Sequence, residues 1–392
     1  MKFPKLFLNP GSSRSRGLLA IESATMLPFP LPPYPYDRLN DLRAVAVERH
    51  GSAIDMSIGA PVDPPPTAVV EALATSGRER GYPPSIGSPT FREAAQGWMS
   101  SQFGAEVDTM SIGATVGLKE FVVGAPHWLR LRNPEKDTVL YPAISYPSYA
   151  MGAELSHGRA VPVPLDGDGK MQLDAIDASD IARASLLWVN SPGNPTGAVA
   201  DLAEIAEWGR SNGVPVLSDE CYIEFTWDGP ADTIVNHGVE GVLAIHSLSK
   251  RSNLAGVRVG FYAGDPDLVH WFQEIRKHVG MMVPAPSQFA ASVALADQDH
   301  VNSQRDIYRN RLGLMIDFLA TVGVTAPMPG GGFYLWAPAP EGAWELTTRL
   351  ANDVGLIISP GEFYGEDGAD HVRVAVVQPD DAIDELHRRA NG

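Results

Sequence analysis

Five short apolar segments alternate with helical patterns through the middle of this 392-residue chain, and the alternation limits the folds open to it. Each segment is apolar nearly throughout and is bounded by polar residues, glycine or proline, as is typical of strands buried on both faces. The segments are DTVLYP (137–142), SLLWVN (185–190), VPVLSDE (214–220), GVLAIHS (241–247) and VGFYAG (259–264). Because helices lie between them, the pattern predicts an α/β fold with a mainly parallel sheet.

The predicted helices carry boundary signals. Asp201 precedes one predicted helix, and Glu204 lies three residues after Asp201, a spacing typical of a capping box. Gly213 is predicted to end the same helix. Beyond the large sheet the order changes to helices followed by strands, which predicts a smaller α+β domain. The predicted parts are an N-terminal extension (1–25), an arm that includes part of the small domain (26–58), a large domain (59–289) and a small C-terminal domain (290–392).

Charge and cysteine content exclude several classes of function. The formal net charge of −17 argues against nucleic acid or an anionic membrane as a partner, because both need a basic surface. No apolar run approaches the ~18–20 residues of a membrane-spanning helix. Cys221 is the single cysteine, so neither an intrachain disulfide nor a thiolate metal cluster can form, and we predict a cytoplasmic protein. The ten histidines show no HxxxH or HExxH spacing, so no metal site is predicted.

Polar side chains follow several of the predicted strands, where an open parallel sheet binds its ligands. Asn194 follows one strand, Asp219 ends the next, and Lys250 follows a third. Each has a plain alternative, since Asn194 could be a turn residue, Asp219 a helix cap, and the segment around Lys250 a solvated turn. Residues 113–120 (GATVGLKE) are predicted to form a small-residue turn that opens a helix, whose amides could accept a phosphate.

The order of motifs resembles the fold-type I aminotransferases, which use pyridoxal 5′-phosphate (PLP). The matching motifs are YPPSIGSPTFREA, GLKE, YPAISYPSY, NSPGNPTG, SDECY, SLSK with Arg258 eight residues after the lysine, GGGFYLW and VRVAVV. The resemblance implies a large domain with a mainly parallel seven-stranded sheet between helices, a smaller α+β domain, and a homodimer with a shared active site. It also implies a small-molecule amino donor and a 2-oxo acid acceptor.

The resemblance implies a role for each matching residue around the cofactor ring. Lys250 would form the internal Schiff base and move a proton between substrate and cofactor. Asp219 would pair with the pyridinium nitrogen and keep it protonated. Asn194 and Tyr222 would hydrogen-bond the phenolic oxygen, and Tyr146 would stack on the ring.

Further residues match the parts of the family site that bind anions. The phosphate cup would contain Gly117, Leu118, Lys119, Ser247, Ser249 and Arg258, with Tyr82 reaching it from the other subunit. Arg373 would clamp the α-carboxylate of the substrate, with Asn194 and the backbone of Gly59 beside it.

Several segments are also similar to actinobacterial-type N-succinyldiaminopimelate aminotransferases, among them SDECYIEFTW, SLSKRSNLAGVR and RKHVGMMVPAPSQ. This resemblance implies transfer of an amino group between N-succinyl-LL-2,6-diaminopimelate and 2-oxoglutarate, in lysine biosynthesis. The alternatives are an aminotransferase for aspartate or aromatic amino acids, and a PLP-dependent carbon–sulfur β-lyase. Lys119, Arg251 and Lys277 are candidates for binding the distal carboxylate.

Overall fold

The computed structural model describes residues 32 and 34–391. From Pro35 onward the chain forms one compact unit with a seven-stranded, a three-stranded and a two-stranded sheet. The predicted N-terminal extension, residues 1–25, and the first part of the predicted arm lie outside the described residues. Within the described part, each helix is too short or too polar to cross a membrane.

The seven-stranded sheet has the order β2-β8-β7-β6-β5-β3-β4. Strand β8 pairs antiparallel with β2 and β7, and all other pairs are parallel. The predicted mainly parallel sheet is therefore confirmed. Its strands are β2 (Ile112–Thr115), β3 (Thr138–Pro142), β4 (Arg159–Val163), β5 (Ala184–Asn190), β6 (Val216–Asp219), β7 (Val242–Ser247) and β8 (Gly260–Gly264).

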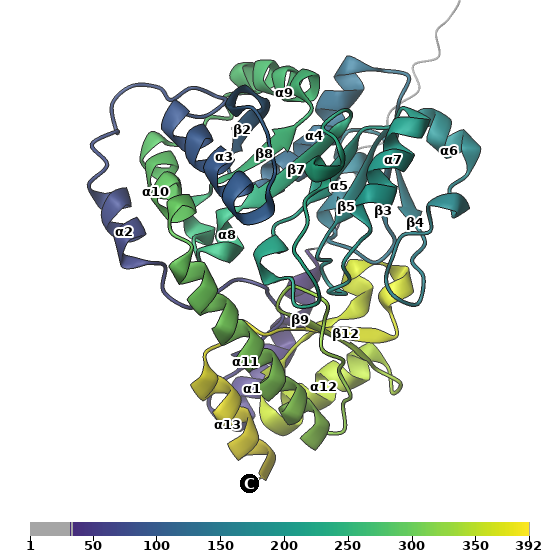
Figure 1. Cartoon of the computed structure of the whole chain (residues 1–392). Helices are drawn as coiled ribbons and strands as arrows, with labels where there is room; N and C mark the ends of the chain where they lie inside the picture. Colours follow the sequence, from purple (N-terminus) through teal and green to yellow (C-terminus); the bar gives the residue numbers. More distant parts are fainter. Residues whose placement is uncertain (1–31, 33, 392) are drawn as a thin grey trace, which may run out of the picture. The chain divides into compact units, whose positions relative to one another are not determined.

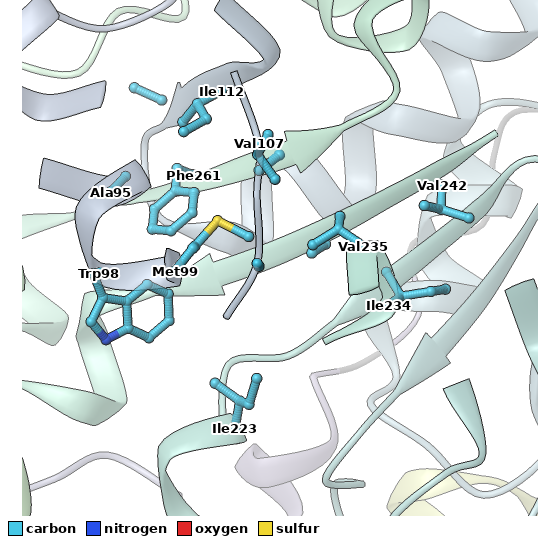
Figure 2. Packing of buried hydrophobic residues seen from close by; sticks show 14 of the residues in the cluster. Ala95, Trp98, Met99, Val107, Ile112, Ile223, Ile234, Val235, Val242 and Phe261 are labelled. Atoms are coloured by element: carbon cyan, nitrogen blue, oxygen red, sulfur yellow. The ribbon is translucent and has the colours of Figure 1, made fainter. Parts of the chain in front are cut away.

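Helices cover both faces of this sheet, because successive side chains of a strand point to opposite faces. In β5, Leu186 and Trp188 pack with α4, α5 and α9, whereas Leu187 and Val189 pack with α2, α3, α7 and α10. Figure 2 shows the hydrophobic core on the face of the sheet that α2, α3, α7 and α10 cover, where Trp98 and Met99 of α3 lie against Phe261 of β8. The helices are α2 (Thr67–Ala74), α3 (Pro89–Phe103), α4 (Leu118–Arg132), α5 (Ser148–Leu155), α6 (Ala178–Arg183), α7 (Leu202–Asn212), α8 (Leu248–Arg251), α9 (Pro266–Val279) and α10 (Ala285–Ala296).

The predicted helix boundary at Asp201 is confirmed. Its carboxylate accepts a hydrogen bond from the backbone N–H of Glu204 at 3.0 Å, and the helix α7 ends at Gly213 in the left-handed conformation (φ 62°). Ser88 caps α3 in the same way by accepting from the N–H of Phe91. These caps satisfy amide groups that the helices themselves leave without partners.

A second group of elements surrounds the three-stranded antiparallel sheet, whose order is β11-β12-β9. The long helix α11 passes from α10 toward β9 and α13 (Figure 1). Short strands β1 and β10 pair in parallel beside this sheet. The elements are α1 (Asn40–His50), β1 (Ile54–Asp55), α11 (Asp299–Thr321), β9 (Tyr334–Pro338), α12 (Ala343–Val354), β10 (Leu356–Ile357), β11 (Ser359–Pro360), β12 (His371–Ala375) and α13 (Asp380–Asn391). The boundary between domains at residue 289 stays a prediction.

Two edge strands, β2 and β4, are absent from the strands that the sequence predicts. Residues 113–115 were predicted as part of a turn, but they belong to β2, which pairs with β8. Small residues are required there, because a Cβ on Gly113 would lie 2.3 Å from the ring of Tyr262. The turn prediction is correct only from Gly117 onward, where α4 begins. Strand β4 is partly exposed and contains Pro162, so it lacks the apolar run that marked the other strands.

Candidate functional site

The side chain of Lys250 lies at the carboxyl end of β7. Ser247 ends this strand and caps the single turn α8, which places Lys250 one turn beyond the sheet. The ammonium group donates a hydrogen bond to the carbonyl oxygen of Gly59. Burial lowers the pKa of Lys250 to about 8, and the positive charges of Arg373 and Arg258 act in the same direction. About a tenth of the Lys250 side chains are therefore in the neutral, nucleophilic amine form at pH 7, far more than for an ordinary lysine.

Asp219 lies at the end of the neighbouring strand β6, paired in register with Ile245 of β7. Its Oδ2 accepts a hydrogen bond from the Tyr149 hydroxyl at 2.9 Å, and its Oδ1 accepts from the Cys221 N–H at 3.3 Å. Burial raises the pKa of Asp219, while these bonds oppose the rise. A cationic N–H beside this carboxylate would favour its charged form.

A cradle for an anion lies where α4 begins. Gly117 has a left-handed backbone (φ 68°), and a Cβ at this position would lie 2.1 Å from Nη2 of Arg258. Arg258 also has a positive φ of 57°, and its Nη1 donates to the carbonyl oxygen of Ala255 at 2.9 Å. The guanidinium thus lies directly against the backbone at the N-terminus of α4, where helix amides also attract negative charge.

Arg373 forms the center of a second cationic site on β12. Its side chain is buried, Nη1 donates to Oδ1 of Asn194 at 2.8 Å, and Nη2 donates to the carbonyl oxygen of Ser57. The guanidinium carbon lies 4.4 Å from the ring centroid of Tyr334 and 4.6 Å from that of Tyr364. Its buried Nε has no hydrogen-bond partner within the described chain. A guanidinium held in this way is suited to a carboxylate.

Two tyrosine hydroxyls meet between these groups. The Tyr222 and Tyr334 oxygens are 2.7 Å apart, and both side chains are buried. Burial raises the pKa of each phenol, so both hydroxyls keep their protons at neutral pH. The pair can therefore donate hydrogen bonds to a buried acceptor.

A sequence profile of the family "Aminotransferase class I and II" matches residues 52–389. The chain belongs to this family. It is 37% identical over 361 residues to the 4-dedimethylamino-4-oxo-anhydrotetracycline transaminase OxyQ of Streptomyces rimosus, a match that covers 90% of this chain and 97% of that protein. It is 33% identical to the LL-diaminopimelate aminotransferase of Desulforudis audaxviator, covering 92% of this chain and 95% of that one.

Solved structures agree with this assignment. A probable N-succinyldiaminopimelate aminotransferase of Thermus thermophilus superposes with a TM-score of 0.82 at 29% identity, over 91% of this chain and all of that one. Substrate-bound BacF of Bacillus subtilis gives a TM-score of 0.84 at 26% identity, over 92% and 94% of the two chains. The protein is therefore an aminotransferase that acts on amino and oxo-acid substrates.

Aminotransferases of this family use PLP, and the residues described above fit this cofactor. The cradle of Gly117 and Arg258 leaves no room for a side chain at its floor, which suits a phosphate. The buried carboxylate of Asp219 suits a protonated ring nitrogen, and the amine of Lys250 suits covalent attachment. Among the described residues, by contrast, no group of three His, Cys, Asp or Glu could hold a metal ion.

The remaining residues that were predicted to bind the cofactor lie at the end of β7, in the first turn of α4 and just before α5. Ser247 accepts a hydrogen bond from the N–H of Ser249, and both side chains are buried. Leu118 and Lys119 lie in the first turn of α4. The ring of Tyr146 lies edge-on to Tyr149, with centroids 5.9 Å apart.

Tyr82 stands apart from this cluster. Its side chain is 93% exposed, in the segment between α2 and α3. The structure of one chain thus leaves Tyr82 available for contact with another molecule.

Two of the candidates for binding a distal carboxylate already have partners within the chain. Arg251 is buried, and its Nε pairs with Oε1 of Glu224 at 3.0 Å, while its Nη1 donates to the carbonyl oxygen of Ala294. These bonds leave it as a structural charge. Lys277 lies on the surface of α9 and pairs with Glu274. Their roles in binding a distal carboxylate stay predictions.

Sequence reasoning missed three tyrosines of the site: Tyr36, Tyr149 and Tyr334. Tyr149 lies three residues after Tyr146 in SYPSY, and only the packing of α5 shows which of the two contacts Asp219. Tyr36 lies in the proline-rich arm, and its hydroxyl is 3.0 Å from that of Tyr364. Tyr334 follows the segment GGGF, and this run of glycines was the sequence feature that could have indicated a segment whose backbone packs closely against its neighbours.

Proposed function

We propose that this aminotransferase transfers an amino group between N-succinyl-LL-2,6-diaminopimelate and 2-oxoglutarate. The observation that carries the proposal is the buried guanidinium of Arg373, held by Asn194 and flanked by two tyrosine rings. Such a group selects the α-carboxylate that donor and acceptor share. The choice of donor is supported by similarity to the T. thermophilus structure and to diaminopimelate aminotransferases.

Lys250 is proposed to attach the cofactor and to move the substrate proton. Its pKa near 8 allows the amine both to attack a carbonyl carbon and to accept or release a proton near neutral pH. PLP, when bound, supplies an electron sink for the negative charge that develops at the substrate Cα. Because Lys250 lies at the end of β7, the rigid sheet fixes the position from which the proton moves.

The remaining residues are proposed to hold and orient the reactants. Asp219 would pair with the ring nitrogen of the cofactor, Asn194 and Tyr222 would contact its phenolic oxygen, and Tyr146 would pack on the ring. The cofactor phosphate would be held by the cradle of Gly117, Leu118, Lys119, Ser247, Ser249 and Arg258. Arg373 binds the α-carboxylate, and the backbone of Gly59 lies beside it. Burial of Asp219 and Arg373 strengthens the interactions of these two charges by excluding water.

Tyr82 is proposed to complete the phosphate site across a homodimer. Its high exposure in the single chain supports this role. Mixing the impaired variant Tyr82→Phe with the inactive variant Lys250→Ala should raise the activity above that of either variant alone, because one hybrid site would contain both natural residues. A fully active monomer in sedimentation would overturn the shared site.

The substrate proposal is tested by an amino-donor screen with 2-oxoglutarate as acceptor. We expect the highest kcat/KM for N-succinyl-LL-diaminopimelate, with lower values for free LL-diaminopimelate, aspartate, alanine and aromatic amino acids. A higher value for free LL-diaminopimelate would move the assignment to the activity named for the D. audaxviator relative. A higher value for aspartate or an aromatic donor would remove the succinylated substrate. Formation of pyruvate from cystathionine without a keto acceptor would identify a β-lyase.

A further inference from the structure

The side chain of Tyr334 contacts three parts of the site, two through its hydroxyl and one through its ring. It is 2.7 Å from the hydroxyl of Tyr222, and a Cβ on Gly59 would lie 2.0 Å from it. The carbonyl oxygen of Gly59 accepts the hydrogen bond from Lys250, and the Tyr334 ring lies against Arg373. Tyr334 itself comes from β9 of the three-stranded sheet, whereas Tyr222 follows β6 of the seven-stranded sheet.

The direction of the hydrogen bond between Tyr222 and Tyr334 follows from the number of protons that each hydroxyl can donate. A phenol has one proton to donate and can accept through its oxygen. In the proposed function Tyr222 gives its proton to the phenolic oxygen of the cofactor. The proton between the two tyrosines must then come from Tyr334, so that Tyr334 donates to Tyr222 and Tyr222 donates to the cofactor.

We propose that Tyr334 is a positioning residue, which orients the Tyr222 hydroxyl and strengthens its hydrogen bond to the cofactor. This inference rests on the proposed role of Tyr222. Hydrogen bonds in series polarise one another, and this effect is larger at a buried site than in water. Tyr334 also fixes the Tyr222 rotamer, because the two rings pack edge to face at 5.4 Å.

The consequence is a change in the protonation of the bound cofactor. A donor to the phenolic oxygen stabilises its deprotonated, negatively charged form, so the cofactor gains a proton only at lower pH. Weakening this donor should raise the midpoint of the pH-dependent change in the visible absorption band. For Tyr334→Phe we expect an upward shift of roughly half a pH unit, since the lost polarisation is a fraction of one charged hydrogen bond.

The test is a spectroscopic pH titration of the holoenzyme and three variants. Tyr334→Phe keeps the ring over Arg373, so a loss of packing does not explain a shift. Tyr222→Phe should shift the midpoint further in the same direction. The double variant should match Tyr222→Phe alone, because Tyr334 acts through the Tyr222 hydroxyl.

Tyr308→Phe is the matched control. Tyr308 is also buried beside Phe333, with ring centroids 4.9 Å apart, and its hydroxyl has no hydrogen-bond partner in the described chain. Its removal should leave the midpoint unchanged.

An unchanged midpoint in Tyr334→Phe, with a normal wild-type band, would overturn the inference and leave the proposed function intact. A full Tyr334→Phe shift on the Tyr222→Phe background would also overturn it, because the effect would then bypass Tyr222. Failure of the proposed function is separate, since the wild-type protein would then lack the visible band or the amino-transfer reaction itself.

Discussion

The Tyr149 hydroxyl and the Asp219 carboxylate, from α5 and the end of β6, are joined by a buried hydrogen bond of 2.9 Å. The Tyr149 ring is held in turn by stacking on Trp188, with ring centroids 5.1 Å apart. Because Trp188 lies on β5, the neighbouring strand, the sheet itself fixes the direction of the carboxylate. Asp219 is thus pre-oriented before any ligand arrives, which lowers the entropy cost of pairing with a cationic ring nitrogen.

Replacing Asp219 with asparagine should abolish most of the chemistry and spare cofactor binding. The amide keeps the size of the carboxylate but no longer stabilises a protonated ring nitrogen. We expect the rate of the half-reaction with an amino donor to fall by orders of magnitude while the visible band persists. Tyr149→Phe is the graded comparison, with a smaller loss because the carboxylate remains. A half-reaction rate in Asp219→Asn equal to that of the wild type would contradict the assigned role.

Lys250 should carry the covalent attachment of the cofactor. Borohydride treatment of the yellow holoenzyme should remove the visible band and leave the label on the peptide that contains Lys250. Lys277 serves as an internal control, since it pairs with Glu274 on the surface of α9 and should stay unlabelled. A label on Lys119 would show that the amine at the start of α4 is the reactive one.

Arg373→Lys should lower kcat/KM for every donor by a similar factor. Lysine retains the positive charge but loses the planar, two-point recognition of a carboxylate. The expected loss is about 2 kcal/mol, roughly 30-fold, as for one charged hydrogen bond. Arg349→Lys provides the comparison, because this arginine pairs with Glu341 on the surface. A loss confined to one donor would mean that Arg373 contacts the distal part of the substrate instead.

The buried pair Glu220 and His246 predicts the pH dependence of stability. Burial raises the pKa of Glu220 to about 8 and lowers that of His246 to about 3, from ordinary values of 4.5 and 6.5. Between pH 4.5 and 6.5 the folded state, compared with the unfolded state, binds one more proton on Glu220 and one fewer on His246. The two contributions to the pH dependence of the free energy of unfolding therefore cancel in this range. Above pH 6.5 only the Glu220 effect remains, and the free energy of unfolding should fall until about pH 8.

Glu220→Gln should remove this decline. One proton changes the free energy of unfolding by about 1.4 kcal/mol per pH unit, so the wild type should lose about 2 kcal/mol across the interval relative to the variant. The measurement is denaturant unfolding of holoenzyme at both ends of the interval. The exposed Glu135, changed to glutamine, should leave the wild-type slope in place. Equal slopes in Glu220→Gln and the wild type would show that Glu220 is ionised in the folded state.

The sequence predicted the large sheet and the grouping of Asn194, Asp219 and Lys250, because topology alone brings the carboxyl ends of parallel strands to one edge. It did not predict β2 or the partner of Asp219. Strand β2 was missed because a run of small residues is typical of a turn, and the packing of the Tyr262 ring against Gly113, which requires a small residue there, cannot be read from the sequence. The partner of Asp219 depends on how α5 packs, which neither periodicity nor motif order contains.

The bond between Arg373 and Asn194 has a further consequence, because it joins residues 179 positions apart, one on β12 and the other in the turn that follows β5. A carboxylate bound at this pair would contact both β12 and the turn after β5, and its binding would be lost when either part opens. Substrate binding is thus thermodynamically linked to local unfolding of the C-terminal segment. We therefore expect amide hydrogens of β12 and β9 to exchange more slowly when the ligand is bound, including those that lie away from it.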